Sequence, residues 1–128
     1  MKVLLDTHAF LWLMSDHKNL SATAKKVFLD NDNELLLSAV SGFEIAVKYG
    51  LGKLKLAEPP INFVQRRIEN NDLTELPISM AHATQLQALP AHHRDPFDRL
   101  LVAQAMIEGV PLLTSDKQLS AYPIKCIW

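Results

Sequence analysis

Val3-Leu4-Leu5-Asp6, a short apolar run that ends at a carboxylate, is the stretch that decides the fold class. Apolar runs of this length are typical of parallel strands, because such strands are buried on both faces. Four further runs of this kind follow along the chain, at residues 34–37, 73–76, 110–113 and 123–127. The sequence therefore predicts five short strands.

Helical patterns lie between these runs. Ser21, Ser79 and Asp95 are suited to begin helices as N-caps, and Gly109 is suited to end one. The expected helices span residues 22–29, 41–49, 80–89 and 96–108, and another begins at Pro59-Pro60; residues 53–60 are expected to form an exposed loop. Strands that alternate with helices predict a parallel sheet with helices on both faces, a three-layer α/β/α architecture. Ligands of such folds bind at the carboxyl ends of the strands.

Composition sets limits on the class of protein. A length of 128 residues with 48% hydrophobic residues suits one domain, spanning residues 1–128. The only cysteine, Cys126, excludes an intrachain disulfide and a cysteine-based zinc site. Asp6 interrupts the first apolar run too early for a signal peptide, and no stretch approaches the roughly 18 apolar residues of a transmembrane helix. We expect a cytoplasmic protein.

Asp6 and Glu44 each allow a structural and a chemical interpretation. Asp6 stands between a strand and a helix, where it can cap the helix or bind a metal at the sheet edge. Glu44 lies on the apolar stripe that Val40, Phe43, Val47 and Leu51 are expected to form. A charge seldom points inward without a partner, although an ion pair with Lys48 is an alternative. The stripe position favours a functional role for Glu44.

Asp98 and Asp116 complete a set of four acids. Asp95 and Pro96 make a good helix start, so we assign capping mainly to Asp95. Asp98 shares a helix face with apolar residues and leans toward the interior, which favours a chemical role. Asp116 follows the fourth strand through Thr114-Ser115, whose hydroxyls either support a site or stabilise the turn.

Four carboxylates near one sheet edge would repel one another. Two of them about 4 Å apart repel by about 4 kcal/mol at an effective dielectric of 20. Mg²⁺ or Mn²⁺, which prefer oxygen ligands, would relieve this repulsion and could activate water for phosphodiester hydrolysis. The net charge is −1, so neutralising four acids leaves −1 + 4 = +3, which mildly suits RNA. Candidate phosphate contacts are Lys48, Lys53, Lys55, Arg66, Arg67, Arg94 and Arg99.

Four stretches resemble the signature blocks of PIN-domain ribonucleases, and most closely those of the VapC toxins of bacterial toxin–antitoxin pairs. They are Leu4-Leu5-Asp6-Thr7, residues 41–48, residues 94–105 and Leu113-Thr114-Ser115-Asp116, in family order over nearly the whole chain. The resemblance implies the PIN fold and an acidic quartet, Asp6, Glu44, Asp98 and Asp116, that binds Mg²⁺ or Mn²⁺ and cleaves RNA. It also implies a cognate antitoxin and a homodimer. Many relatives carry Asn where His8 stands, which puts a supporting contact in doubt.

Other features of the sequence bear on the oligomeric state and on alternative functions. The helix around residues 9–14 is apolar all round, which favours a homodimer contact over burial within one chain. The histidines His8, His17, His82, His92 and His93 lack zinc-ligand spacing, and His92-His93 is expected to be a loop pair. A phosphatase of the haloacid dehalogenase type would need Asp at position 8, which is His. A catalytically idle PIN-fold interaction module remains an alternative, although it would have no reason to keep four repelling acids.

Overall fold

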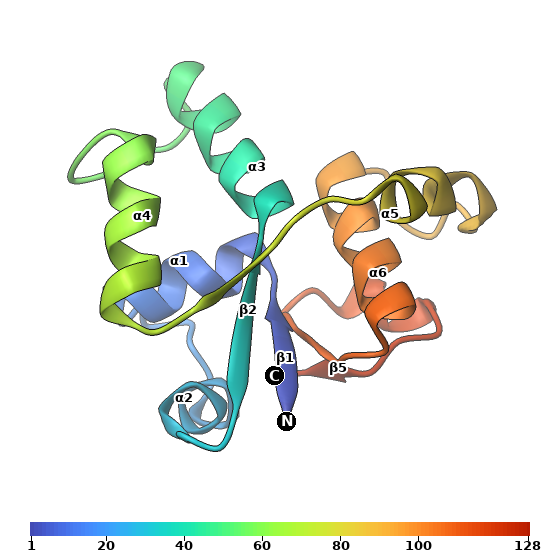
Figure 1. Cartoon of the computed structure of the whole chain (residues 1–128), viewed down its shortest axis with the longest axis horizontal. Coiled ribbons are helices and arrows are strands. Elements are labelled where there is room, and N and C mark those ends of the chain that lie inside the picture. The colour runs from blue at the N-terminus through green and yellow to red at the C-terminus, as the bar shows by residue number, and fades with distance from the viewer.

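The computed structural model describes residues 1–128 and contains a five-stranded, entirely parallel sheet (Figure 1). The strand order is β3-β2-β1-β4-β5. The strands are β1 (Lys2–Leu5), β2 (Glu34–Ser38), β3 (Thr74–Leu76), β4 (Leu112–Leu113) and β5 (Cys126–Ile127). All five predicted strands are present, and the parallel sheet is confirmed.

The helices follow the predicted starts closely. They are α1 (Thr7–Ser15), α2 (Ala22–Leu29), α3 (Ala39–Gly50), α4 (Pro60–Asn70), α5 (Met80–Gln85) and α6 (Pro96–Glu108), with 3-10 turns η1 (Leu86–Ala88) and η2 (Lys117–Ala121). Ser21, Ser79 and Asp95 cap α2, α5 and α6 as expected, and Gly109 ends α6 with a positive φ of 65°. The helix predicted over residues 80–89 is shorter than expected, because it tightens into η1 after Gln85. No helix combines the length and hydropathy needed to cross a bilayer.

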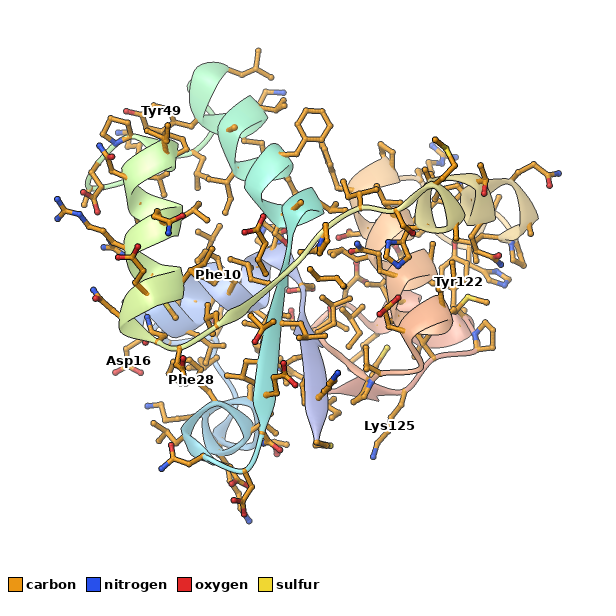
Figure 2. The ribbon with its side chains drawn as sticks, in the orientation of Figure 1. Phe10, Asp16, Phe28, Tyr49, Tyr122 and Lys125 are labelled. Carbon is orange, nitrogen blue, oxygen red and sulfur yellow. The ribbon has the colours of Figure 1, made fainter.

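Two hydrophobic cores, one on each face of the sheet, produce the three layers. Helices α1, α2 and α4 lie on one side and α5 and α6 on the other, while α3 extends from the carboxyl end of β2 (Figure 1). Neighbouring strand residues point to opposite cores: Val3 and Leu5 join one, and Leu4 joins the other. Figure 2 shows Phe10 and Tyr122 on these two sides.

Helix α1 is buried within its own chain. Ala9, Phe10 and Leu13 pack into the core on their side of the sheet, and Phe10 is fully buried. Leu11 and Trp12 are half-buried and line a pocket described below. The fold of one chain therefore explains the side of this helix that faces the sheet, whereas the partly exposed Leu11, Trp12 and Met14 leave the homodimer contact a prediction.

Helix α3 is oriented differently from the prediction. It buries Val40, Ser41, Glu44 and Ile45, whereas Phe43 and Leu51 of the expected stripe are 57% and 65% exposed. The predicted stripe was wrong because α3 turns a partly polar face toward the sheet edge, so the spacing of its apolar residues does not mark the buried side. Glu44 is nevertheless buried, as expected.

The carboxyl ends of the strands meet between α3 and α6 (Figure 1). Strand β1 is central, with β2 on one side and β4 on the other. Residues that follow β1 and β4 are therefore brought together with residues from α3 and from the start of α6.

Candidate metal centre

Asp6, directly after β1, is both a helix cap and a buried site carboxylate. Its side chain is only 4% exposed. The N–H of Ala9 donates to Asp6 Oδ1 at 2.6 Å, and the hydroxyl of Thr114 donates to Oδ2. Burial raises the pKa of Asp6, the two hydrogen bonds lower it in part, and the charge of Glu44 raises it again. The two interpretations of Asp6 are thus compatible.

Glu44 presents one carboxylate oxygen without a hydrogen-bond partner. The residue is 2% exposed, and its Oε2 forms an ion pair with Lys48, one turn later on α3. Its Oε1 is buried and receives no hydrogen bond. Burial lowers the pKa of Lys48, but the hydrogen bond and charge of Glu44 outweigh burial and leave that pKa raised. A buried carboxylate oxygen without a donor is unfavourable unless a cation approaches it.

Asp95 and Asp98 divide their roles as the sequence suggests. Asp95 Oδ1 accepts the N–H of Phe97 at 2.8 Å and so caps α6. The Asp98 side chain is 16% exposed and lies on the same face of α6 as the fully buried Leu101 and Val102. No backbone N–H donates to the Asp98 carboxylate, so this residue is not a cap.

The environment of Asp98 disfavours its charged form. Burial has the largest effect, and the charges of Asp95, Asp6 and Glu44 add to it, so that the pKa of Asp98 rises to about 7. The neighbouring His93 lowers this pKa only in part. Acids at the end of β1, on α3 and at the start of α6 therefore all lie near the Asp98 carboxylate.

Asp116 lies on the turn after β4. Its Oδ1 accepts the N–H of Gln118 at 2.9 Å, which makes it the N-cap of η2. Its own N–H donates to Thr114 Oγ1 at 3.1 Å, so Thr114 contacts both Asp6 and Asp116. Its side chain is 34% exposed and is the most accessible of the four carboxylates for which the sequence predicts a role.

His93 belongs to the same cluster, although the sequence predicted only a loop residue. Its Nε2 lies 2.9 Å from Asp116 Oδ2 and 3.5 Å from Asp98 Oδ2. The ligand atoms of His93, Asp98 and Asp116 all lie within 4.8 Å of one another, a spacing that suits a metal ion. The available signal was the position of His93 two residues before the Asp95 cap, but its contact with Asp116 depends on the fold.

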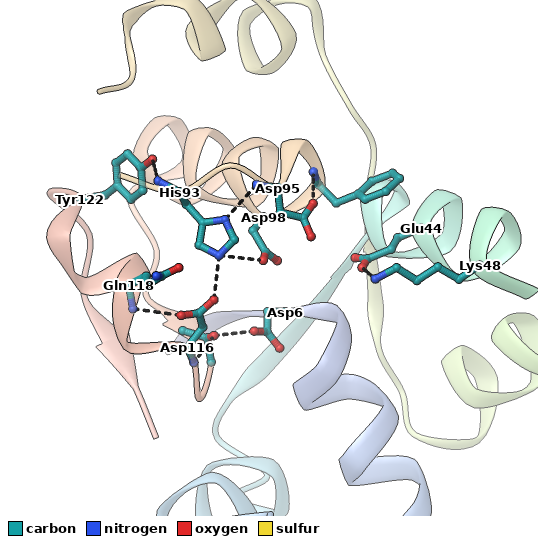
Figure 3. Close-up of polar contacts among 11 residues, drawn as sticks. Asp6, Glu44, Lys48, His93, Asp95, Asp98, Asp116, Gln118 and Tyr122 are labelled. Carbon is teal, nitrogen blue, oxygen red and sulfur yellow. Dashed lines mark hydrogen bonds and ion pairs between the residues drawn. The ribbon is translucent and has the colours of Figure 1, made fainter. Parts of the chain in front are cut away.

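Figure 3 shows Asp6, Glu44, Asp98 and Asp116 around a common space, with His93 on the side of Asp116. The structure thus brings together all four acids named from the sequence, although Asp6 and Glu44 lie outside the closest group of three. The residues present fit a divalent cation. A hard cation would supply the missing partner of Glu44 Oε1 and offset the charge that raises the pKa of Asp98.

Of the seven basic residues considered for RNA, four have contacts within the chain: Lys48 with Glu44, and Arg66, Arg67 and Arg99 as follows. Arg99 donates to the carbonyl oxygens of Leu86 and Leu89, both at 3.2 Å. Arg66 and Arg67 both pair with Glu58. Lys53, Lys55 and Arg94 have no ion pair and remain candidates for contact with phosphates.

A pocket of about 630 Å³ lies beside Glu44, on the side of α1 and α4. Its lining extends from Glu44 and Lys48 along α1 to the loop before α4. The wall combines apolar and basic side chains, among them Leu11, Trp12, Leu54, Leu56, Lys53, Lys55 and Arg67.

Comparison with known proteins shows the family of the chain and its fold. The family model described as PIN domain matches residues 3–125. The chain is 31% identical over 121 residues to Ribonuclease VapC22 of Mycobacterium tuberculosis. The matched region covers 94% of this chain and 91% of that protein.

Solved structures share the fold at lower sequence identity. VapBC2 from Rickettsia felis, bound to a promoter DNA fragment, superposes with a TM-score of 0.73 at 17% identity, covering 98% of this chain and 97% of that one. DNA-bound VapBC from Salmonella typhimurium superposes with a TM-score of 0.71 at 21% identity, covering 98% of this chain and 96% of that one. These two likenesses establish the fold.

Proposed function

Because the chain belongs to the PIN domain family, as a relative of the VapC ribonucleases, we propose that it is a metal-dependent endoribonuclease and the toxin of a toxin–antitoxin pair. Asp6, Glu44, Asp98 and Asp116 are its catalytic and metal-binding residues. The observation that carries this proposal is Glu44 Oε1, a buried carboxylate oxygen without a partner, in a cluster where burial and then neighbouring charges raise the pKa of Asp98 to about 7.

The cation that suits this oxygen-rich cluster is Mg²⁺ or Mn²⁺. When bound, it would lower the pKa of a water molecule and offset charge on the phosphate. The chain's own residues supply the geometry. Ala9 and Thr114 hold both oxygens of Asp6, and Gln118 and His93 contact both oxygens of Asp116. Lys48 adds a positive charge at the rim, beside Glu44.

The test is cleavage of single-stranded RNA by the purified chain with Mg²⁺ or Mn²⁺. We expect internal cleavage that leaves a 5′-phosphate and that stops when EDTA is added, because attack by water needs no 2′-hydroxyl. Asp98→Asn should reduce the rate by at least about 100-fold, whereas Glu69→Gln, an exposed change on α4, should leave it unchanged. Products ending in a 2′,3′-cyclic phosphate would contradict the proposed chemistry.

The pocket beside Glu44 supports the proposal of an antitoxin partner. Leu11 and Trp12 offer apolar contact, and Lys53 and Lys55 offer positive charge. This combination suits an amphipathic, acidic segment of another protein, whose acidic side chains would lie near Lys48. We expect the product of a neighbouring gene to bind the chain and inhibit cleavage. Trp12→Ala should weaken that binding, and Ile107→Ala, an exposed apolar change on α6, should not.

A homodimer is part of the proposal and rests on the family resemblance and on the partly exposed apolar side chains of Leu11, Trp12 and Met14 on α1. Sedimentation at micromolar concentration would test it, and a single monomeric species would contradict it.

A further inference from the structure

We propose that His93 is a positioning residue that holds the carboxylate of Asp116 toward the metal site through its Nε2–H and is not itself a metal ligand. This inference rests on the proposed function, because it assigns His93 a role beside the cation that Asp116 would bind. It concerns a residue outside the four carboxylates, in the loop between η1 and α6 (Figure 3).

The hydrogen-bonding pattern of the ring identifies its tautomer. The backbone N–H of Asp95 donates to His93 Nδ1 at 3.0 Å. A neutral imidazole has one nitrogen that donates and one that accepts. Because Nδ1 accepts, the proton resides on Nε2, 2.9 Å from Asp116 Oδ2. Asp98 Oδ2 is more distant, at 3.5 Å. The ring therefore donates primarily to Asp116.

This tautomer separates a positioning role from a ligand role. Spacing alone would allow His93, Asp98 and Asp116 to bind one metal ion. A ligating Nε2 would need a free lone pair, which requires the ring proton to move to Nδ1. There it would meet the N–H of Asp95, and a hydrogen bond would be lost. The backbone of Asp95 thus favours a donor at Nε2.

The contact completes the orientation of Asp116. Gln118 donates to Oδ1 at 2.9 Å, and His93 donates to Oδ2. Without His93, one oxygen of a side chain that is 34% exposed would have no protein donor. Donors of this kind fix the direction of a metal-binding carboxylate, and their removal typically weakens metal binding by about 10–100-fold.

The loop that carries His93 is itself fixed by a buried residue. Tyr122, which is 2% exposed, donates its hydroxyl proton to the carbonyl of Pro90 at 2.9 Å. The same hydroxyl accepts the N–H of His93 at 3.1 Å. His92 is exposed and places its ring against that of Tyr122, with centroids 5.0 Å apart. The two adjacent histidines thus differ: His93 contacts the site carboxylates, whereas His92 is exposed and contacts only the ring of Tyr122.

The first test is the nitrogen-15 NMR spectrum of the histidines in the full chain without metal, at pH 8. We expect His93 to carry its proton on Nε2 and to keep it when Mg²⁺ is added. A proton on Nδ1, or loss of the Nε2 proton on saturation with Mg²⁺, would overturn the proposal. Because the metal-free measurement needs no cation, it tests His93 even if the chain binds no metal, a result that would refute the proposed function instead.

The second test is Mn²⁺ affinity measured by calorimetry. His93→Ala should weaken binding by about 10-fold or more. His93→Gln, whose side-chain N–H can reach the place of Nε2, should recover most of that loss, whereas His93→Asn, which is too short, should not. His92→Gln is the matched control and should bind within about twofold of wild type. Unchanged affinity in His93→Ala, or failure of the Gln variant to recover affinity, would overturn the proposal.

Discussion

Thr114 donates its hydroxyl proton to Asp6, although 108 residues separate the two along the chain. The same oxygen of Thr114 accepts the N–H of Asp116. One buried side chain thus connects the residue that follows β1 with the residue that follows the neighbouring strand β4. The Thr114 hydroxyl was one of two candidates in the sequence, and the structure gives it two contacts with predicted site residues.

Replacing Thr114 with Val should therefore disturb both carboxylates. The change keeps the side-chain shape but removes the donor to Asp6 and the acceptor for Asp116. We expect a loss of about 1–3 kcal/mol in the free energy of unfolding, measured with urea. Metal affinity should fall as well. Thr114→Ser keeps the hydroxyl and should retain most of both properties; a Val variant as stable as wild type would contradict the structural role.

Asp98 should make the stability of the metal-free chain depend on pH. Its pKa is raised from 3.8 to about 7, so the folded chain binds this proton more tightly than the unfolded chain does. The resulting stability is complete below about pH 4 and is lost as the pH rises through about 7. Asp98→Asn cannot titrate. At pH 8 it should be more stable than wild type by on the order of 2 kcal/mol, and at pH 4 about equal to it.

Urea unfolding in EDTA at pH 4 and pH 8 measures this difference. Asp32→Asn, on an exposed turn, serves as the control and should follow wild type at both pH values. A metal-free Asp98→Asn chain that is clearly less stable than wild type at pH 8 would argue that Asp98 has a structural role at the start of α6.

Lys48 should contribute most to the stability of the chain when no metal is present, because it is the only cation paired with the buried Glu44. Removing one partner of a fully buried ion pair costs about 3–5 kcal/mol. Lys48 is 34% exposed, so we expect on the order of 1–3 kcal/mol for Lys48→Met. Mg²⁺ should raise the melting temperature of this variant more than that of wild type. Lys53→Met, in the same pocket but without an ion pair, is the control, and an equal effect of both changes would refute this role.

Asp95 should behave as a helix cap. Asp95→Ala removes the acceptor for the N–H of Phe97 and should lower the free energy of unfolding by about 1 kcal/mol. Asp95→Ser offers an alternative acceptor at the same position and should restore most of that loss. Thermal unfolding of both variants in EDTA provides the measurement, and equal stability of the Ala and Ser variants would show that the cap contributes little.

Local sequence signals were sufficient to predict the helices that begin with a capping residue. Asp95-Pro96 predicts the start of α6, and the acids that follow β1 and β4 lie at the same sheet edge because the strands are parallel. These features depend on neighbouring residues or on the general geometry of the fold, so the sequence reveals them.

Contacts between segments that are distant in the chain could not be predicted from local sequence patterns. The buried side of α3 was wrongly assigned because that helix faces the polar site through Ser41 and Glu44 rather than a purely apolar core. His93 was overlooked because its partner Asp116 lies 23 residues later on another turn. The homodimer contact expected of α1 stays a prediction, because the core of its own chain covers Phe10 but leaves Leu11 and Trp12 partly exposed.

The pairing of β1 with β4 also determines when, during synthesis on the ribosome, the carboxylates can assemble. Asp6, Glu44 and Asp98 emerge before β4 and Asp116. A growing chain therefore exposes three of the acids without the strand that aligns them. An incomplete or truncated product that ends before β4 should be harmless to the RNA around it, because the proposed nuclease activity begins only after β4 has joined the sheet.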